Sequence, residues 1–259
     1  MRRFSTEYLR RTREGMWADS RDVLEPLRLE SCGRVLDVGC GEGALTGVLR
    51  EECPGEVVGC DRDAALLAEL DGPTVRGNAY RLPVRDDAVD LVVCQALLIN
   101  LPEPRRAVRE FARVAGARVA CIEPDNAAVS VRSTVEAERG LATRARERYL
   151  AGVDTDVALG GDAAGLLRAE CLSNVRTMRY DQTLVVEPPY SEADVRAVGR
   201  KANAAGLRGR RPTMAGSMED LDALRSEWRA MGREAVRQLR DEEYRRAETV
   251  PFYVTVGEV

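Results

Sequence analysis

Histidine is absent from this chain of 259 residues, and lysine occurs once, as Lys201. The lack of histidine removes the side chain that most often acts as a general base and most often binds transition metals. Arginine therefore carries nearly all of the positive charge, and the formal net charge is −4. Such a chain lacks the net basic footprint that phosphate backbones require, which disfavours nucleic acid as the main partner.

Two further absences concern cysteine patterns and long apolar runs. The seven cysteines are odd in number and none are spaced as CxxC, so the sequence predicts neither a disulfide framework nor a metal site. The N-terminus, MRRFSTEYLRR, is charged and has no apolar core, unlike a signal peptide. No segment approaches 18 consecutive apolar residues, so we expect no membrane partner and a location in the reducing cytoplasm.

Short β-rich runs alternate with helical stretches from Arg34 onward. This alternation is typical of βαβ units around a parallel sheet, and it predicts an α/β fold. We expect strands at 34–38, 56–60, 74–76, 89–94 and 118–122, with helices at 44–52, 63–70 and 104–114 between them.

The second half of the chain has looser spacing. Residues 125–170 have a mostly helical pattern, followed by a strand at 175–186, helices at 192–205 and 218–246 around an arginine-rich loop, and a strand at 251–256. Ser217 and Asp220 form a capping-box pattern at the start of the last helix. We expect a single domain with an N-terminal helical segment (1–30), a core (31–124), a partly helical region (125–247) and a final strand (248–259).

The most informative segment is VLDVGCGEGALT, residues 35–46, in which an apolar strand runs into Gly39, Gly41 and Gly43 before a helix. Glycine permits unusual backbone dihedrals, and without a Cβ it lets a ligand lie against the backbone. The following helix N-terminus suits an anionic end of that ligand. The same residues, with Ala44, also satisfy the dinucleotide fingerprint GxGxxG/A, and a tight turn without a ligand is a third interpretation.

Asp61 ends the second expected strand, 18 residues after Gly43. A carboxylate in this place can accept hydrogen bonds from both hydroxyl groups of a ribose. Taken alone, an ordinary surface or helix-capping aspartate would be the simpler interpretation, but the spacing favours ribose binding.

Several motifs in order resemble the class I S-adenosylmethionine-dependent methyltransferases, in particular the broad type 11 group that acts on small molecules. The resemblance runs from about Arg34 to Pro124, roughly a third of the chain. The matching segments are Asp37–Gly43, Asp61, Gly77–Pro83 (GNAYRLP), Asp90–Gln95 (DLVVCQ) and Leu98–Pro104 (LINLPEP).

This resemblance implies a Rossmann-like sheet of seven mostly parallel strands in the order 3-2-1-4-5-7-6, with the last strand antiparallel and a helical cap. It implies S-adenosylmethionine as cofactor and S-adenosylhomocysteine as product. It also explains Asp37, since an acid two residues before the first glycine is unusual in dehydrogenases. The residues expected to bind the cofactor are Asp37, Gly39, Cys40, Gly41, Asp61, Arg62, Asn78, Ala79 and Gln95.

The sequence departs from the family pattern at two places. Asn78 stands where the family usually has aspartate, although an amide oxygen can still accept a bond from the adenine amino group. No histidine occurs near Ile99 or Asn100, where the family often has one, so proton removal by histidine is not available.

With this function, 1–30 is expected to be a helical lid, 31–124 the core that binds the cofactor and 125–247 a cap on the acceptor side. The acceptor is expected outside the carboxyl ends of the strands, beneath the cap, because methyl transfer benefits from the exclusion of water. Glu123 is the candidate general base, with a solvated strand-end acid as the alternative. Tyr8 and Trp17 are candidates to close over the cofactor, although core packing is the simpler interpretation. Arg208, Arg210 and Arg211 are candidates to bind an anionic acceptor, or form a solvated loop.

The sequence predicts a methyltransferase that holds a small-molecule acceptor in line with the activated methyl group. Two other functions share the same motifs. A nicotinamide-dependent oxidoreductase would use the glycine loop and Asp61, but would not explain Asp37 or the GNAYRLP segment. A non-catalytic protein that binds S-adenosylmethionine would keep every motif.

Overall fold

The computed structural model describes Trp17 and residues 21–259, which form two compact units. Of the described residues, unit 1 comprises Trp17, 21–125, Ala158–Tyr180 and Pro251–Val259, and unit 2 comprises Asn126–Val157 and Asp181–Val250. The expected cap, 125–247, thus lies mostly in unit 2, while Ala158–Tyr180 belongs to unit 1. Its placement over an acceptor stays a prediction.

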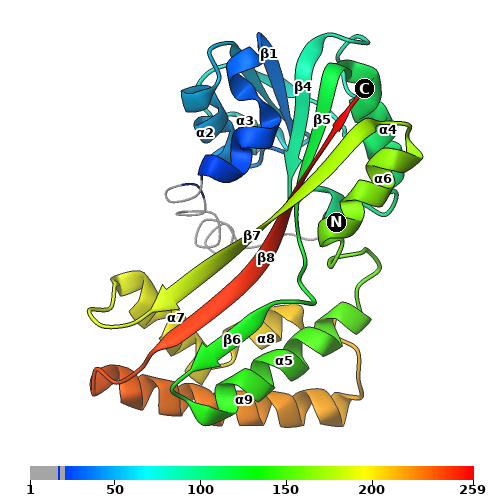
Figure 1. The fold of residues 1–259 in the computed structure, drawn as a ribbon. Coiled ribbons are helices and arrows are strands. Elements are labelled where there is room, and N and C mark those ends of the chain that lie inside the picture. Colours follow the sequence, from blue (N-terminus) through cyan, green and yellow to red (C-terminus); the bar gives the residue numbers. More distant parts are fainter. Residues whose placement is uncertain (1–16, 18–20) are drawn as a thin grey trace. The chain divides into compact units, whose positions relative to one another are not determined.

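A mostly parallel sheet forms the centre of unit 1 (Figure 1). Its strands run in the order β3-β2-β1-β4-β5-β8, and β7 also pairs with β8. β8 lies antiparallel to β5, and Arg118–Pro124 pair with Phe252–Glu258. If β6, which pairs with the first part of β8, is left out of the count, β7 is the sixth strand and β8 the seventh. The order is then 3-2-1-4-5-7-6 with an antiparallel last strand, which confirms the predicted Rossmann-like sheet. The strand bounds are Arg34–Val38 (β1), Glu56–Asp61 (β2), Thr74–Arg76 (β3), Val89–Gln95 (β4), Ala115–Pro124 (β5), Ser173–Val186 (β7) and Arg246–Glu258 (β8).

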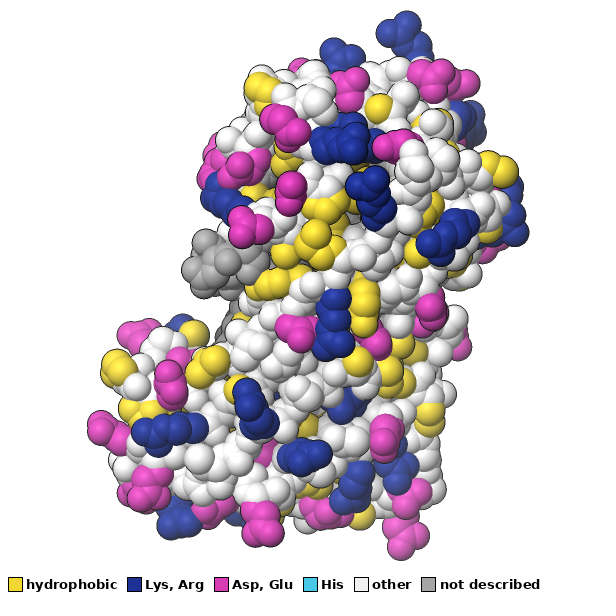
Figure 2. Space-filling model, in the orientation of Figure 1, with side chains coloured by type: hydrophobic (Ala, Val, Ile, Leu, Met, Phe, Trp, Pro, Cys, Tyr) yellow, Lys and Arg dark blue, Asp and Glu magenta, His cyan; other side chains and the backbone are white. Residues whose placement is uncertain are grey.

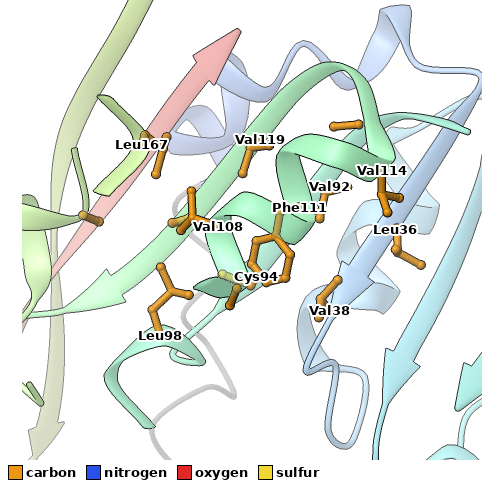
Figure 3. Packing of buried hydrophobic residues seen from close by; sticks show 14 of the residues in the cluster. Leu36, Val38, Val92, Cys94, Leu98, Val108, Phe111, Val114, Val119 and Leu167 are labelled. Atoms are coloured by element: carbon orange, nitrogen blue, oxygen red, sulfur yellow. The ribbon is translucent and has the colours of Figure 1, made fainter. Parts of the chain in front are cut away.

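Helices cover both faces of this sheet, and the alternation of β1 shows which helix lies on which face. Asp37 points to α2 (Ala44–Glu52), where it accepts a hydrogen bond from Thr46, whereas Leu36 and Val38 point to the opposite face. There α4 (Pro104–Val114) buries Phe111 among apolar side chains of β1, β4 and β5 (Figure 3). Burial of such a phenylalanine contributes about 1.5–3 kcal/mol.

The remaining helices of unit 1 are short. They are the 3-10 helices η1 (Arg21–Leu27), η2 (Leu29–Ser31), η3 (Leu98–Asn100) and η4 (Gly160–Asp162), and the α-helices α3 (Ala64–Leu67) and α6 (Ala163–Ala169). In the segment predicted to be an N-terminal helical lid (1–30), residues 21–31 form the 3-10 helices η1 and η2 rather than an α-helix, and Pro26 lies within η1. The other residues of this segment, except Trp17, lie outside the described residues, and its role as a lid stays a prediction. In the described part of the chain, no helix has both the length and the apolar composition that a membrane span needs.

Unit 2 has a hydrophobic core of its own. It contains α5 (Glu136–Ala151), α7 (Glu192–Ala202), α8 (Ala205–Arg210), α9 (Met218–Arg240) and β6 (Ser130–Ser133), which pairs with Arg246–Thr249 of β8. Leu141, Val198, Leu224 and Met231 are among the buried side chains that these helices share. β6 was not expected, since 125–170 was predicted to be mostly helical. Its sequence, SVRS, instead forms a short strand that pairs with β8.

The long helix α9 begins as predicted and ends earlier. The Ser217 hydroxyl accepts from the Asp220 N–H at 3.1 Å, and the Asp220 carboxylate accepts from the Ser217 N–H, which completes the capping box. The helix ends at Arg240 rather than 246 because Glu242 has a positive φ of 58° and the chain turns into β8. The arginine-rich segment before α9, predicted to be a loop, contains the helix α8.

A buried ion cluster also organises unit 2 around Glu138 of α5, which is 1% exposed. Its carboxylate accepts from the Lys201 ammonium, from Nε of Arg246 at 3.0 Å, from the Tyr244 hydroxyl at 2.8 Å and from the Ser133 hydroxyl at 2.6 Å. These four donors come from α7, β8, the turn before β8, and β6. A charge buried to this degree is stable only when it is paired in this way.

Candidate functional site

The glycine loop Gly39–Gly43 connects the carboxyl end of β1 to α2. Its three glycines have φ values of +75°, +56° and +80°, in the left-handed region that favours glycine. The N–H groups of Gly39 and Cys40 donate to the Cys60 carbonyl at 2.7 and 3.1 Å, which ties the loop to β2. The loop is thus held at the edge of the sheet where cofactors bind in open α/β folds.

Two of the three glycines also meet the protein's own side chains. A Cβ on Gly39 would lie 2.8 Å from Cδ1 of Leu97, and a Cβ on Gly43 would lie 2.8 Å from Cδ2 of Leu70. Close packing within the protein therefore accounts for part of the glycine pattern that we attributed to an approaching ligand.

Asp61 lies at the end of β2 with its carboxylate against the glycine loop. Oδ2 accepts from the Gly41 N–H at 3.1 Å, and Oδ1 accepts from the Asp63 N–H at 2.9 Å. Each carboxylate oxygen can accept a second bond. Asp61 thus fixes the loop and keeps acceptor capacity for a diol, as the ribose prediction requires.

Asp37 is buried, at 1% exposure, beneath the loop. Its Oδ2 accepts from the Thr46 hydroxyl at 2.6 Å, so the acid links β1 to α2 on either side of the glycines. Asp37 therefore supports the glycine loop from beneath.

Among the described residues, the side chains of Cys40 and Arg62 show no contact that points to a ligand. The Cys40 side chain is buried over Gly59 of β2, and this burial raises the pKa of its thiol. Arg62 is exposed, and its carbonyl accepts from Nε of Arg76 at 3.1 Å. Cys40 can therefore contribute to a ligand site mainly through its backbone.

Asn78 and Ala79 follow β3 in a tight turn. The Asn78 side-chain oxygen accepts from the Tyr80 N–H at 3.0 Å, and its backbone carbonyl accepts from the Arg81 N–H at 2.8 Å. An aspartate would form the same turn, because the accepting atom is an oxygen in either residue. Ala79 is half-buried and packs against the core of unit 1.

Gln95 and Glu123 end the neighbouring strands β4 and β5, and both are buried. Oε1 of Glu123 accepts from the backbone N–H groups of Leu97 at 3.1 Å and Leu98 at 2.8 Å, and Oε2 accepts from Ile99 at 3.3 Å. Burial raises the pKa of the Glu123 carboxyl to about 7, although these three N–H groups favour the charged form. The solvated strand-end acid that we considered for Glu123 is therefore wrong; as a general base it stays a prediction.

Of the residues predicted on the acceptor side, Tyr8 lies outside the described residues, and Trp17 is buried. The three arginines lie in or beside α8 of unit 2. Arg211 forms a bidentate pair with Asp222 at 2.6 and 3.1 Å, and the Arg210 guanidinium lies 5.4 Å from the centre of the Tyr149 ring. Arg208 is exposed.

Sequence reasoning missed three residues that shape the site: Thr46, Leu70 and Leu97. The sequence places each of them in an apolar or helical pattern with no mark of its role. Thr46 lies within the glycine segment 35–46, but nothing local in the sequence marks its hydroxyl as the donor to Asp37. Leu70 and Leu97 contact Gly43 and Gly39 from elements farther along the chain, so no local signal could have identified them.

Comparisons with known proteins agree with this geometry. A family model described as a methyltransferase domain matches residues 36–137. A trans-aconitate 2-methyltransferase of Rhodococcus jostii is 33% identical over 184 residues, covering 66% of this chain and 70% of that protein. A demethylmenaquinone methyltransferase of Lactiplantibacillus plantarum is 36% identical over 118 residues, covering 40% and 50%. A solved structure from Anabaena variabilis is described as a methyltransferase of an antibiotic biosynthesis pathway. It is 15% identical, with a TM-score of 0.54, and the match covers 88% of this chain and 96% of that one. At this identity the likeness shows the fold alone.

The chain belongs to the class I S-adenosylmethionine-dependent methyltransferases. Within that class its matching domain is that of the type 11 group. The chain spans about half the length of the demethylmenaquinone methyltransferase that it matches.

The residues present fit the cofactor of this class, S-adenosylmethionine. Asp61, at the end of β2, has a carboxylate that would accept from a ribose diol. The glycine loop leads into α2, which begins without a side-chain cap and so leaves N–H groups for a carboxylate.

Proposed function

We propose that this protein transfers the methyl group of S-adenosylmethionine to a small-molecule acceptor by in-line displacement. The observation that carries the proposal is the glycine loop held between two acids, with Asp37 bonded to Thr46 beneath it and Asp61 bonded to Gly41 beside it. A nicotinamide-dependent oxidoreductase would account for Asp61 but not for the buried Asp37.

The sulfonium of the cofactor supplies a methyl group that is already activated, so the chain must mainly orient the reactants. Asp61 and the loop would hold the cofactor, while the segment after β4 would form the wall nearest the acceptor. Orientation of two reactants can contribute on the order of 7–11 kcal/mol to lowering a barrier. This mechanism suits a chain without histidine.

A small acceptor also agrees with the distribution of charge. On the face drawn in Figure 2, arginine and acidic side chains are interspersed, whereas a nucleic-acid backbone would favour a continuous basic surface. The named relatives methylate trans-aconitate or demethylmenaquinone, so carboxylic acids and quinols are the first acceptor classes to test. We propose the cytoplasm as the compartment, where the seven free cysteines would stay reduced.

Two measurements test the proposal. Titration calorimetry should show binding of S-adenosylmethionine and S-adenosylhomocysteine, with NAD and NADP much weaker; a preference for a nicotinamide cofactor would overturn it. Incubation with radiolabelled S-adenosylmethionine and a panel of carboxylic acids and quinols should then transfer label to an acceptor. Tight cofactor binding with no transfer to any small molecule would instead favour a non-catalytic binding protein.

A further inference from the structure

Glu123 is fully buried; it accepts a long bond of 3.7 Å from the Cys94 thiol, and its bonds from backbone N–H groups converge on one short segment. The carboxylate accepts from three successive backbone N–H groups, those of Leu97, Leu98 and Ile99, at 2.8–3.3 Å. This segment immediately follows β4 and begins at Ala96, whose φ of +48° is unusual for a residue other than glycine. Glu123 therefore holds the backbone at a sharp turn where the carboxyl ends of β4 and β5 meet.

The same segment reaches the glycine loop through Leu97. Atoms Cδ1, Cδ2 and Cγ of Leu97 lie 2.8, 3.1 and 3.2 Å from the position that a Cβ on Gly39 would occupy, so the isobutyl group covers this glycine. One residue thus has its N–H bound by Glu123 and its side chain packed on the loop. A continuous path of contacts connects the end of β5 to the cofactor loop at the end of β1.

We propose that Glu123 is a positioning residue, which holds Leu97 against Gly39 and so keeps the glycine loop in the shape that binds the cofactor. This inference rests on the proposed function and assigns Glu123 a role different from proton transfer. A general base must reach the proton that it removes. The Glu123 carboxylate has no exposed surface, and its oxygens are occupied by the segment that it supports.

The two roles predict different effects on cofactor affinity. Glu123→Gln keeps an oxygen for the Leu97 and Leu98 N–H groups, which both bond to Oε1, and loses only the longer bond to Ile99. Glu123→Leu loses all three. Leu97→Ala leaves Glu123 intact but removes the side chain that covers Gly39. Leu166→Ala is the matched control, because Leu166 of α6 is also half-buried and packs on the core of unit 1.

The experiment is titration calorimetry of each folded variant with S-adenosylhomocysteine, which needs no acceptor. We expect Leu97→Ala and Glu123→Leu to weaken affinity by about 3- to 30-fold, with Glu123→Gln closer to the wild type and Leu166→Ala unchanged. Thermal unfolding identifies any variant that fails to fold; if Glu123→Leu does, the comparison of Leu97→Ala with Leu166→Ala decides.

Equal affinity of Leu97→Ala and the wild type would overturn the proposal. So would normal affinity in all Glu123 variants, which is the result that a general base or a purely structural residue predicts. If the wild type itself does not bind S-adenosylhomocysteine, the proposed function fails instead, and the two failures are distinguishable.

Discussion

Replacement of Asp61 by alanine tests the candidate site at its most specific residue. In the structure the Asp61 carboxylate accepts hydrogen bonds from the Gly41 and Asp63 N–H groups. The resemblance to the family predicts that it also accepts from two ribose hydroxyls. A hydrogen bond to a charged acceptor contributes about 1.5–3 kcal/mol. Loss of one or two such bonds to the ribose should weaken the binding of S-adenosylhomocysteine by roughly ten- to several-hundred-fold. The fold should persist, because Asp61 is a half-buried residue at a strand end.

Asp63→Ala is the matched control, since it removes the same group two residues away. Asp63 caps α3, where its carboxylate accepts from the Ala65 N–H at 3.0 Å. Loss of this cap should lower the free energy of unfolding by about 1 kcal/mol and leave cofactor affinity nearly unchanged. Calorimetry with S-adenosylhomocysteine and urea unfolding of both variants separate the two effects.

The reasoning would be refuted if Asp61→Ala bound S-adenosylhomocysteine as tightly as the wild type. Equal losses in the Asp61 and Asp63 variants would also contradict it, because the start of α3 rather than the Asp61 carboxylate would then control affinity. The affinity of Asp61→Asn should lie between those of Asp61→Ala and the wild type, since the amide keeps one accepting oxygen but places its NH₂ group opposite one of the two backbone N–H groups that the carboxylate binds.

Three further predictions concern the loop and unit 2. Gly41→Val should abolish calorimetric binding of S-adenosylhomocysteine, because a β-branched residue disfavours a φ of +56° and adds bulk at the loop; retained binding would exclude a close approach there. Glu138→Gln should lower the free energy of urea unfolding by about 3–5 kcal/mol by leaving buried cations uncompensated. The exposed pair of Arg144 and Glu227 provides its control, and Glu227→Gln should cost less than about 1 kcal/mol; equal losses would contradict a special role for the cluster. The pKa of Lys201, lowered to about 8 by burial and by the nearby Arg246, should appear in an NMR titration of protein labelled with ¹⁵N-lysine, which has one lysine signal. Because the unfolded chain keeps this proton to about pH 10.5, Lys201 should make the free energy of unfolding rise between pH 8 and 10.5; a Lys201 midpoint near 10.5 would disprove the shift.

The sequence alone determined the cofactor half of the fold. Strands β1 to β4 end within a residue of their predicted positions, because each is a short apolar run bounded by turn residues, and such signals lie within a few neighbouring positions. The glycine loop and Asp61 were identified for the same reason. The capping box of Ser217 and Asp220 is also local, since its bonds join residues three apart.

Only the tertiary structure decided the contacts that join distant segments. β6 is completed by β8 more than 100 residues later, and Glu138 gathers Lys201 and Arg246 from elements far along the chain. Glu123 binds a segment 24–26 residues before it, and that segment places Leu97 over Gly39. The hydrophobic periodicity of a segment indicates which of its residues are buried. The partners of those residues depend on strand order and register, which the packing of the whole sheet determines.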